Sequence, residues 1–173
     1  MSEPLLRTER LELWPPRLGD MPGLVDLIAA DETRRFLGPA EASAKSQFEK
    51  LLRNAGGWAL YGYGSFHVRL HGEPDIVGSC GIFHTWRGFG QGMDDVPEAG
   101  WIIRHDHWGK GIAGEAMRAA LTWFDATHGP RRIAAMIEDG NAASQKVAAA
   151  LGFLEYGRQE FEGSPLILYE RIG

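Results

Sequence analysis

Residues 98–114, EAGWIIRHDHWGKGIAG, contain the residue types that bind anions, because an apolar strand-like run leads through a polar loop into a glycine-rich turn. Apolar residues then recur at helical spacing from Ala113 to Phe124, which predicts a buried helix after the turn. Such a turn presents unpaired main-chain N–H groups at the positive end of the helix dipole, and glycines let an anion approach the main chain. Residues 109–114 are therefore predicted to form a phosphate site.

Two general nucleotide motifs compete for this turn. A Walker A loop needs glycine where Arg104 stands and serine or threonine where Gly111 stands, so it does not fit. A Rossmann fingerprint fits Gly109, Gly111 and Gly114, with Glu138 or the aspartate after it for a ribose. However, a polar loop separates the strand from the first glycine, and too little chain follows Glu138 for a second dinucleotide half. A nicotinamide oxidoreductase of the Rossmann type therefore remains an alternative.

The composition limits the kinds of protein that fit. A chain of 173 residues with 44% hydrophobic residues is expected to bury the core of one domain, spanning residues 1–173. The formal net charge of -5 argues against a nucleic-acid partner, which needs a basic face. The opening MSEPLLRTERLEL lacks the apolar core of a signal peptide, and no uncharged apolar run reaches the roughly 18 residues of a membrane span. We expect a cytoplasmic protein without a membrane partner.

The single cysteine, Cys80, excludes an intrachain disulfide and fits a reducing compartment. It lies in the apolar run IVGSCGIF, with no charged neighbour to activate a thiolate. We therefore expect a small buried core residue and not a nucleophile.

Alternation and helical spacing predict the elements that must position these residues. In the N-terminal half they are a strand at 8–15, a helix at 21–28 capped by Asp20, a helix at 43–55 ended by Gly56 and Gly57, and strands at 58–70 and 76–83. The next segment, TWRGFGQGMDDVP, is too polar and glycine-rich to be an element and is expected to be a mobile loop.

The C-terminal half predicts a strand at 98–103, a helix at 111–128 and a strand at 132–138, which together form a right-handed parallel crossover. A helix at 141–151, ended by Gly152, and strands at 153–159 and 166–171 complete the chain. The fold class is then α/β, with a mixed sheet whose only parallel step is the central crossover. An apolar edge at 166–169 permits a homodimer.

The segment WGKGIA resembles the phosphate loop of GNAT N-acetyltransferases, whose pattern is Arg/Gln-x-x-Gly-x-Gly/Ala, with Gly111 and Ala113 at the matching positions. Trp108 stands where the broader superfamily has arginine or glutamine. From Glu98 to Phe153 the order EAGW, WGKGIAGEAM, RRIAAMIEDGNAAS and LGF, together with the opening TERLEL, resembles the branch that acetylates ribosomal-protein N-termini. The resemblance implies a GNAT-like acyl-coenzyme A N-acyltransferase fold with splayed parallel strands.

The resemblance implies that acetyl-coenzyme A lies between the strands at 98–103 and 132–138, with no metal required. Its pyrophosphate would lie on N–H groups of residues 109–114, and its pantetheine arm would pair with main chain near residues 102–104. The implied coenzyme-binding residues are Ile102, Ile103, Arg104, Trp108, Gly109, Lys110, Gly111, Ile112, Ala113, Gly114 and Asn141. Whether the side chains of Arg104 and Lys110 meet phosphate or only solvate the loop stays open at this point.

The chemistry needs a neutral amine, because an ammonium ion has no lone pair to attack a thioester. Glu98 is the first candidate for the group that takes the proton, and Glu138 or a water chain is the alternative. Glu98 equally fits a role in holding the loop by hydrogen bonds. Many GNAT enzymes place a tyrosine acid where this chain has Ala148, and Ser144, one turn earlier, is the alternative donor in the resembled branch. Asn141 and Ser144 also fit a simple helix start.

The acceptor follows less directly from the sequence. His84, Trp86, Asp94 and Asp95 are expected near the acceptor end, where Trp86 would form a wall and the aspartates would attract an amine. The triplet at 105–107, His-Asp-His, lacks the further ligands of a zinc site. We expect direct transfer in a ternary complex to a small-molecule amine or a protein N-terminus, and a non-catalytic acyl-coenzyme A-binding module is the alternative.

Overall fold

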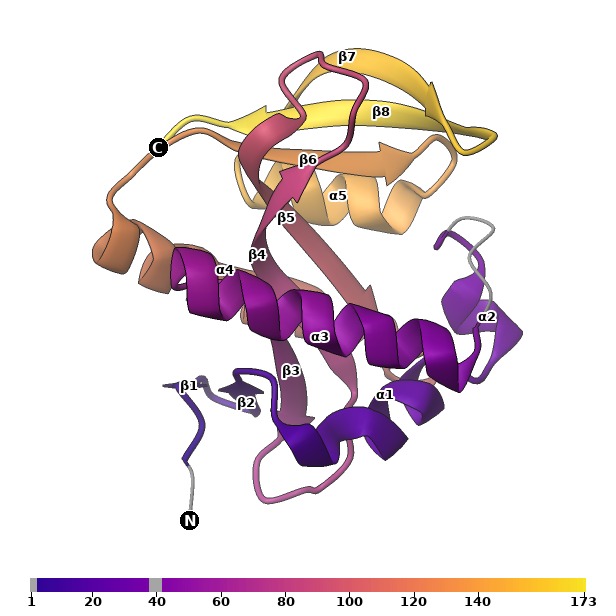
Figure 1. The fold of residues 1–173 in the computed structure, drawn as a ribbon, viewed down its shortest axis with the longest axis vertical. Coiled ribbons are helices and arrows are strands. Elements are labelled where there is room, and N and C mark those ends of the chain that lie inside the picture. The colour runs from indigo at the N-terminus through magenta and orange to yellow at the C-terminus, as the bar shows by residue number, and fades with distance from the viewer. Residues whose placement is uncertain (1–2, 38–41) are drawn as a thin grey trace.

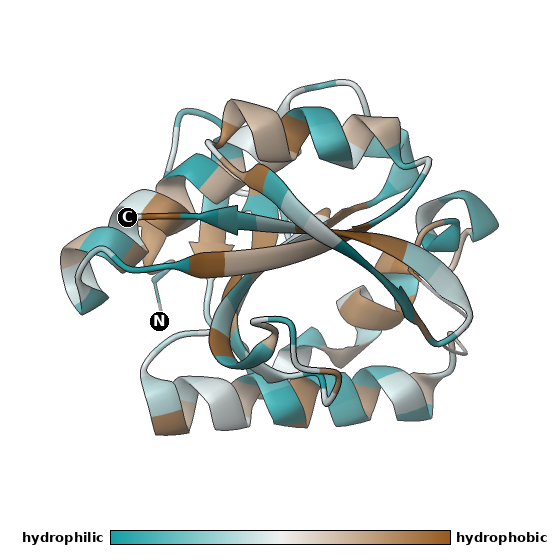
Figure 2. Ribbon diagram, turned by 90° about the horizontal axis from the view of Figure 1, so that it is seen from above, coloured by the Kyte–Doolittle hydropathy of each residue, from teal (hydrophilic) through white to brown (hydrophobic). Residues whose placement is uncertain are grey.

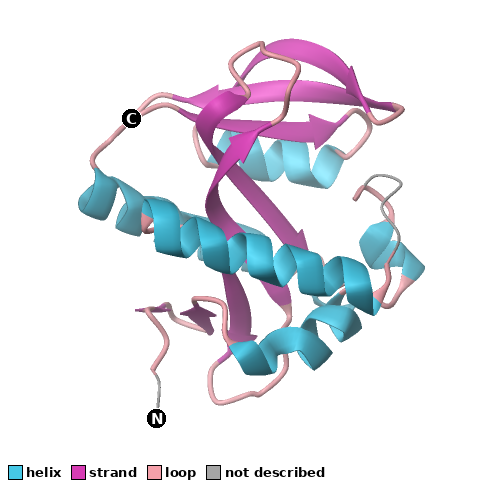
Figure 3. Cartoon of the chain, viewed as in Figure 1, coloured by secondary structure: helices cyan, strands magenta, loops and turns pink. Residues whose placement is uncertain are grey.

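The chain forms one mixed sheet in the computed structural model, which describes residues 3–37 and 42–173 (Figures 1 and 3). Within those residues the sheet has eight strands in the order β1-β2-β3-β4-β5-β6-β8-β7. The strands are β1 Leu6–Arg7, β2 Leu11–Trp14, β3 Ser65–Leu70, β4 Gly78–Trp86, β5 Asp94–Ile103, β6 Ile133–Glu138, β7 Leu154–Phe161 and β8 Ser164–Arg171.

Helices cover both faces of this sheet. They are η1 Leu18–Asp20, α1 Met21–Leu27, α2 Asp31–Arg34, α3 Ala44–Tyr61, η2 His105–His107, α4 Ile112–His128 and α5 Ala142–Ala150. Figure 2 shows α3 on one side of the sheet and α5 on the other. No helix in the described part of the chain is both long enough and apolar enough to cross a bilayer.

The step from β5 through α4 to β6 is parallel, and every other pairing between neighbouring strands is antiparallel. This confirms the expected mixed α/β sheet with a parallel central step. The parallel pairing is short, because Glu98 opposite Ala134 is the one bridge between β5 and β6 in the described structure.

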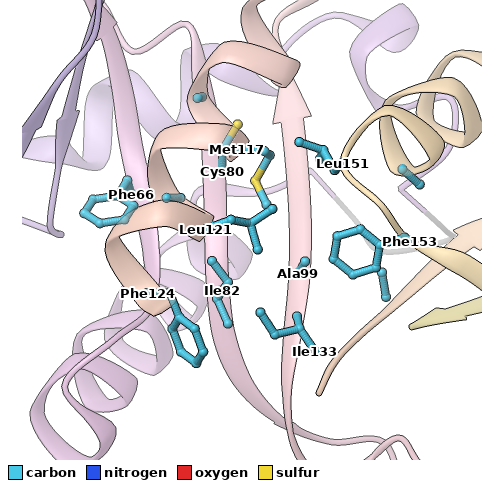
Figure 4. Close-up of a cluster of buried hydrophobic side chains, with 14 of the residues drawn as sticks. Phe66, Cys80, Ile82, Ala99, Met117, Leu121, Phe124, Ile133, Leu151 and Phe153 are labelled. Atoms are coloured by element: carbon cyan, nitrogen blue, oxygen red, sulfur yellow. The ribbon is translucent and has the colours of Figure 1, made fainter. Parts of the chain in front are cut away.

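The main core lies between α4 and the sheet (Figure 4). Met117 and Phe124 of α4 are fully buried against Phe66 of β3 and Ile82 of β4, which confirms the apolar stripe expected on this helix. Cys80 is fully buried in the same cluster, and burial raises the pKa of its thiol to about 12. The thiol is therefore a core group, as expected, because the thiolate is disfavoured there.

A buried ion cluster supports the opposite face. The Asp20 carboxylate accepts a hydrogen bond from Nδ1 of His67 at 2.6 Å and from Nη2 of Arg69 at 2.7 Å. Burial acts to raise the pKa of Asp20, but the hydrogen bonds from His67, the Arg17 main chain and Arg69 outweigh it and hold the pKa well below its usual range. The carboxylate therefore remains charged and joins η1 to β3.

The predicted end of the second helix is wrong. α3 continues through Gly56 and Gly57 and ends at Gly62, whose φ of 77° is left-handed. Residues 58–61 are therefore helical, and the strand begins only at Ser65. Two glycines cost about 1 kcal/mol each in a helix, but Trp58 offsets this by packing on Phe66 and donating to the Ser65 carbonyl.

The segment TWRGFGQGMDDVP, expected to be one long mobile loop, lies partly in two strands. β4 extends to Trp86 and β5 begins at Asp94, so only residues 87–93 lie outside the strands. The Asp94 carboxylate accepts hydrogen bonds from the N–H groups of Gly88 and Gly90. Met93 is fully buried in a cluster with Leu168. Side chains from distant strands thus hold the turn in place.

The C-terminal strand is not an edge. β8 lies between β6 and β7 and pairs with both, so the premise for a dimer through residues 166–169 is wrong. Leu168 is fully buried, because the last strand of the chain inserts inside the sheet instead of extending it.

Replacing the buried carboxylate should destabilise the fold. We expect Asp20→Asn to lower the free energy of unfolding by about 3 kcal/mol at pH 7, because Arg69 loses its buried counter-charge. The folded pKa of Asp20 is lowered, so its contribution is complete above about pH 5 and declines as the pH falls below about 4. Urea unfolding at pH 7 and pH 3 measures this difference.

Asp31→Asn is the matched control, since the Asp31 side chain is 93% exposed. Its effect should stay within about 0.5 kcal/mol. Equal stability of Asp20→Asn and the wild type at pH 7 would contradict the structural role of the cluster.

Candidate functional site

A cleft of about 710 Å³ lies where β5 separates from β6. Its walls come from residues 99–103 of β5, residues 136–138 of β6, the glycine-rich turn and α5. Of the predicted site residues, those lining the cleft are Glu98, Ile102, Ile103, Trp108, Gly109, Gly111, Ile112, Ala113, Gly114, Asn141 and Ser144. The fold thus brings together almost all of the residues that the sequence pattern selected.

The cleft exposes a strand edge in the middle of the sheet. The N–H of Arg104 donates to the Val77 carbonyl beside β4 at 2.9 Å. Because main-chain groups of a strand point to alternate sides, those of Trp101 and Ile103 face the open side toward β6. The Ile103 carbonyl accepts from Nε1 of Trp108 at 2.7 Å. The main chain of Trp101 therefore remains available for an extended ligand that carries amides.

The turn before α4 has the geometry of an anion site. Gly109 and Gly111 have φ values of 72° and 75°, which is left-handed backbone that favours glycine. Gly111 is the N-cap of α4. Within residues 3–37 and 42–173, no group accepts a hydrogen bond from the N–H groups of residues 109–114. These donors, at the positive end of a long helix, fit a pyrophosphate.

The side chains of Arg104 and Lys110 do not line the cleft. Nε of Arg104 donates to the Asp106 carboxylate at 2.8 Å, and Nη1 donates to Asp26 at 3.2 Å. These contacts, chiefly the hydrogen bond to Asp106, raise the pKa of Arg104. Nζ of Lys110 donates to the Asp106 carbonyl at 2.9 Å. Both cations are engaged in holding the loop, and its main-chain donors face the cleft without them.

Glu98 has a partly buried partner, Arg87, that the sequence pattern did not select. Its side chain is 3% exposed, and its two oxygens accept from Nε and Nη2 of Arg87 at 2.8 and 2.7 Å. Arg87 begins the turn 87–93 and also lines the cleft. The only signal for it in the sequence was a lone cation in a glycine-rich segment, which is typical of solvated loops as well.

Ser144 lies in the first turn of α5 and lines the cleft. Its N–H donates to Oδ1 of Asn141 at 3.2 Å, so Asn141 caps α5. Its hydroxyl oxygen accepts from Nε1 of Trp101 at 3.2 Å across the cleft. The hydroxyl proton is therefore free to point at a ligand. Ala148, one turn further, is fully buried, so it presents nothing to the cleft.

The residues expected at the acceptor end lie outside the cleft lining. His84, Trp86, Asp94 and Asp95 are not among the described residues that line the cleft. His84 bonds Tyr63 and Asp95, while Trp86 is 73% exposed. The apolar side chains that do line the cleft come from the segment after α2, from β4 and from the end of β7, and include Phe36, Leu37, Phe83 and Phe161. Alternation along β4 puts Phe83 on the cleft side and turns His84 to the α4 side.

No group of three or more His, Cys, Asp or Glu side chains in the described residues is arranged to hold a metal ion. Within the triplet at 105–107, the main-chain N–H of His105 donates to Oγ1 of Thr33 at 3.0 Å. Asp106 pairs with Arg104. The triplet thus fixes the path of the chain between β5 and the glycine-rich turn.

Comparison with known proteins gives matches over most of the chain. Residues 10–154 match the model of the acetyltransferase (GNAT) domain. An uncharacterized N-acetyltransferase p20 of Bacillus licheniformis is 26% identical over 153 residues, which are 88% of this chain and 83% of that protein.

Solved structures agree with this match. A putative GnaT-family acetyltransferase from Bordetella pertussis is 31% identical, with a TM-score of 0.86 over 96% of this chain and 98% of that chain. RimL, a ribosomal L7/L12 alpha-N-protein acetyltransferase solved in complex with coenzyme A, shares the fold at 17% identity, with a TM-score of 0.78 over 98% of both chains. Since the domain model covers well over half of the sequence, this chain belongs to the GNAT acetyltransferase family.

Proposed function

We propose that residues 1–173 act as one cytoplasmic N-acetyltransferase domain that moves an acetyl group from acetyl-coenzyme A directly to a primary amine in a ternary complex. The observation that carries this proposal is the continuous path from the free edge of β5 to the unpaired N–H groups of residues 109–114. An extended arm ending in a pyrophosphate matches that path, and RimL was solved in complex with coenzyme A.

The coenzyme would be held mainly by main chain. The N–H groups of residues 109–114 would bind its pyrophosphate at the start of α4. The amides of the pantetheine arm would pair with Trp101 and with the free N–H of Ile103. Nδ2 of Asn141 is a further donor at the cleft, because the Oδ1 of this side chain is already used in the cap. When bound, the coenzyme supplies a thioester with a good leaving group.

Ser144 is proposed to serve the leaving thiolate. The amine nitrogen attacks the thioester carbon, a C–N bond forms, the C–S bond breaks, and the sulfur gains a proton. Because Trp101 donates to the hydroxyl oxygen at 3.2 Å, Ser144 directs its proton elsewhere, and the cleft is the open side. The main-chain N–H of Trp101 is the nearest candidate for holding the oxyanion of the intermediate.

Glu98 is proposed to receive the proton of the amine. Arg87 binds both carboxylate oxygens, but each oxygen retains a second lone pair, and Glu98 lines the cleft. The pair also fixes the carboxylate at the junction of β5 and β6, next to the proposed thioester. Glu138, which lines the cleft from the end of β6, is the competing candidate.

The acceptor is proposed to carry its amine on a largely apolar body. Phe36, Leu37, Phe83 and Phe161 are proposed to form the acceptor wall, and the Glu98 carboxylate at the cleft is paired with Arg87. A small apolar amine or a protein N-terminus with an apolar side chain would bury its surface against this wall. A non-catalytic coenzyme-binding module remains the second candidate, because buried Ala148 occupies the position of the usual tyrosine acid.

Coenzyme binding should depend on the backbone of the glycine-rich turn. We expect coenzyme A, but not NADH, to raise the thermal unfolding temperature, since a ligand at 100 times its Kd adds about 2.7 kcal/mol of stability. Gly111→Ala should weaken coenzyme A binding at least about tenfold, because the turn needs a left-handed residue there.

Gly152→Ala is the matched control for that variant. Gly152 has a φ of 86° and nothing within 4 Å of an added Cβ, so the backbone strain is similar, but Gly152 follows α5 and does not line the cleft. Its coenzyme affinity should equal that of the wild type. Stabilisation by NADH alone would contradict the proposal and favour a dinucleotide enzyme.

Removing the hydroxyl at the cleft should slow the chemical step. We expect Ser144→Ala to lower kcat about 100-fold, with coenzyme A affinity within threefold of the wild type. The measurement is thiol release from acetyl-coenzyme A with a panel of small amines and peptides. Gln145→Ala, one residue along α5 and outside the cleft lining, is the control. Tight coenzyme binding with no acetylation across the panel would instead support the non-catalytic module.

The two candidate bases can be separated by paired variants. Glu98→Gln should lower kcat about 100-fold, while Glu138→Gln should have an effect below about threefold. Both variants are first tested for coenzyme A binding, since Glu98→Gln also leaves Arg87 without its counter-charge. The reverse ranking would assign the proton transfer to Glu138.

A further inference from the structure

The TERLEL motif near the start of the chain places a short turn against the start of α4. The turn between β1 and β2 is closed by the N–H of Thr8, which donates to the Leu11 carbonyl at 2.9 Å. The N–H of Leu11 donates back to Oγ1 of Thr8 at 3.0 Å. This local pairing leaves the hydroxyl proton of Thr8 and the side chain of Arg10 directed toward residues more than 100 positions later.

Several contacts from this turn converge on Glu115, in the first turn of α4. Oγ1 of Thr8 donates to Oε1 at 2.6 Å, and the main-chain N–H of Arg10 donates to the same oxygen at 3.0 Å. Nε of Arg10 donates to Oε2 at 2.7 Å, and Nη2 lies 2.6 Å from it. An exposed ion pair alone contributes less than about 1 kcal/mol. A carboxylate bound by two residues through both oxygens is held far more firmly.

Arg10 also binds the glycine-rich turn itself. Its Nη1 donates to the carbonyl of Lys110 at 2.8 Å. Lys110 lies between Gly109 and Gly111, the two left-handed positions of the turn. A carbonyl fixed toward Arg10, outside the cleft, leaves the neighbouring N–H groups directed into the cleft. The contact thus selects the conformation of the turn that binds anions.

The same contacts also compensate the negative charge of Glu115. A free carboxylate in the first turn of α4 would repel a phosphate bound there. Arg10 lies against Glu115 and supplies the opposite charge within hydrogen-bond distance. The negative charge of Glu115 is thereby compensated by Arg10, and its carboxylate points toward the turn between β1 and β2. The main-chain N–H groups at the start of α4 remain available to an anion.

We propose that Thr8 and Arg10 form a latch that holds the glycine-rich turn in its anion-binding conformation and cancels the charge of Glu115. Arg10 is a positioning residue, since it acts through the Lys110 carbonyl and Glu115. The inference rests on the proposed coenzyme site. It assigns a role to the TERLEL motif, which the transfer chemistry itself does not use.

The test compares coenzyme A with pantetheine, which is the same arm without the phosphates and the adenosine, by calorimetric or competition binding to the wild type, Arg10→Ala and Arg7→Ala. Arg10→Ala should weaken coenzyme A binding about 10- to 100-fold, as expected for loss of charge-assisted hydrogen bonds, and change pantetheine binding less than twofold. Arg7, in the same hairpin, pairs only with Glu12 within the described residues, and its side chain is 57% exposed. Arg7→Ala should match the wild type for both ligands.

A second variant separates charge from shape. Adding Glu115→Gln to Arg10→Ala removes the uncompensated carboxylate and should recover coenzyme A affinity at least threefold. Equal losses for coenzyme A and pantetheine, or no loss for either, would overturn the latch while leaving the proposed function intact. A wild-type protein that binds neither ligand would overturn the proposed function and the latch together.

Discussion

The single parallel bridge between Glu98 and Ala134 is the constraint on which the rest of the structure depends. Beyond it β5 and β6 diverge, so main-chain donors and acceptors stand unpaired in the middle of a sheet. A buried main-chain group without a partner costs about 1–3 kcal/mol, so such an edge persists only where water or a ligand reaches it. The cleft is that place, and a ligand with amides completes the sheet.

The surrounding packing keeps the strands from closing. β4 and β5 pair along nearly their whole lengths and are held on one face by Met117 and Phe124 of α4. β6 is held separately, because β8 pairs with it through residues 133–138 and carries β7 with it. β5 and β6 therefore each have a paired neighbour on the side away from the cleft. The gap between the halves is a consequence of two well-packed units joined at one bridge.

Long-range contacts then supply the polar groups of the site. The turn 87–93 delivers Arg87 to Glu98 because Asp94, Met93 and residues of the β7–β8 hairpin hold it. The glycine-rich turn is held in a similar way from the opposite end of the chain by Arg10. Trp101 reaches Ser144 only because α5 lines the other side of the cleft. In each case a side chain from a distant segment fixes a group whose local sequence leaves it free.

The sequence by itself determined the features that depend on local geometry: the stripe of α4, the left-handed turn at Gly109 and Gly111, the Asn141 cap and the parallel step around Glu98. Tertiary structure alone decided the helix through Gly56 and Gly57, the position of β8 inside the sheet and the partnership of Arg87 with Glu98. The reason is physical. Periodicity and turn chemistry act between neighbours, whereas burial and ion pairing depend on which distant residues the completed fold brings together.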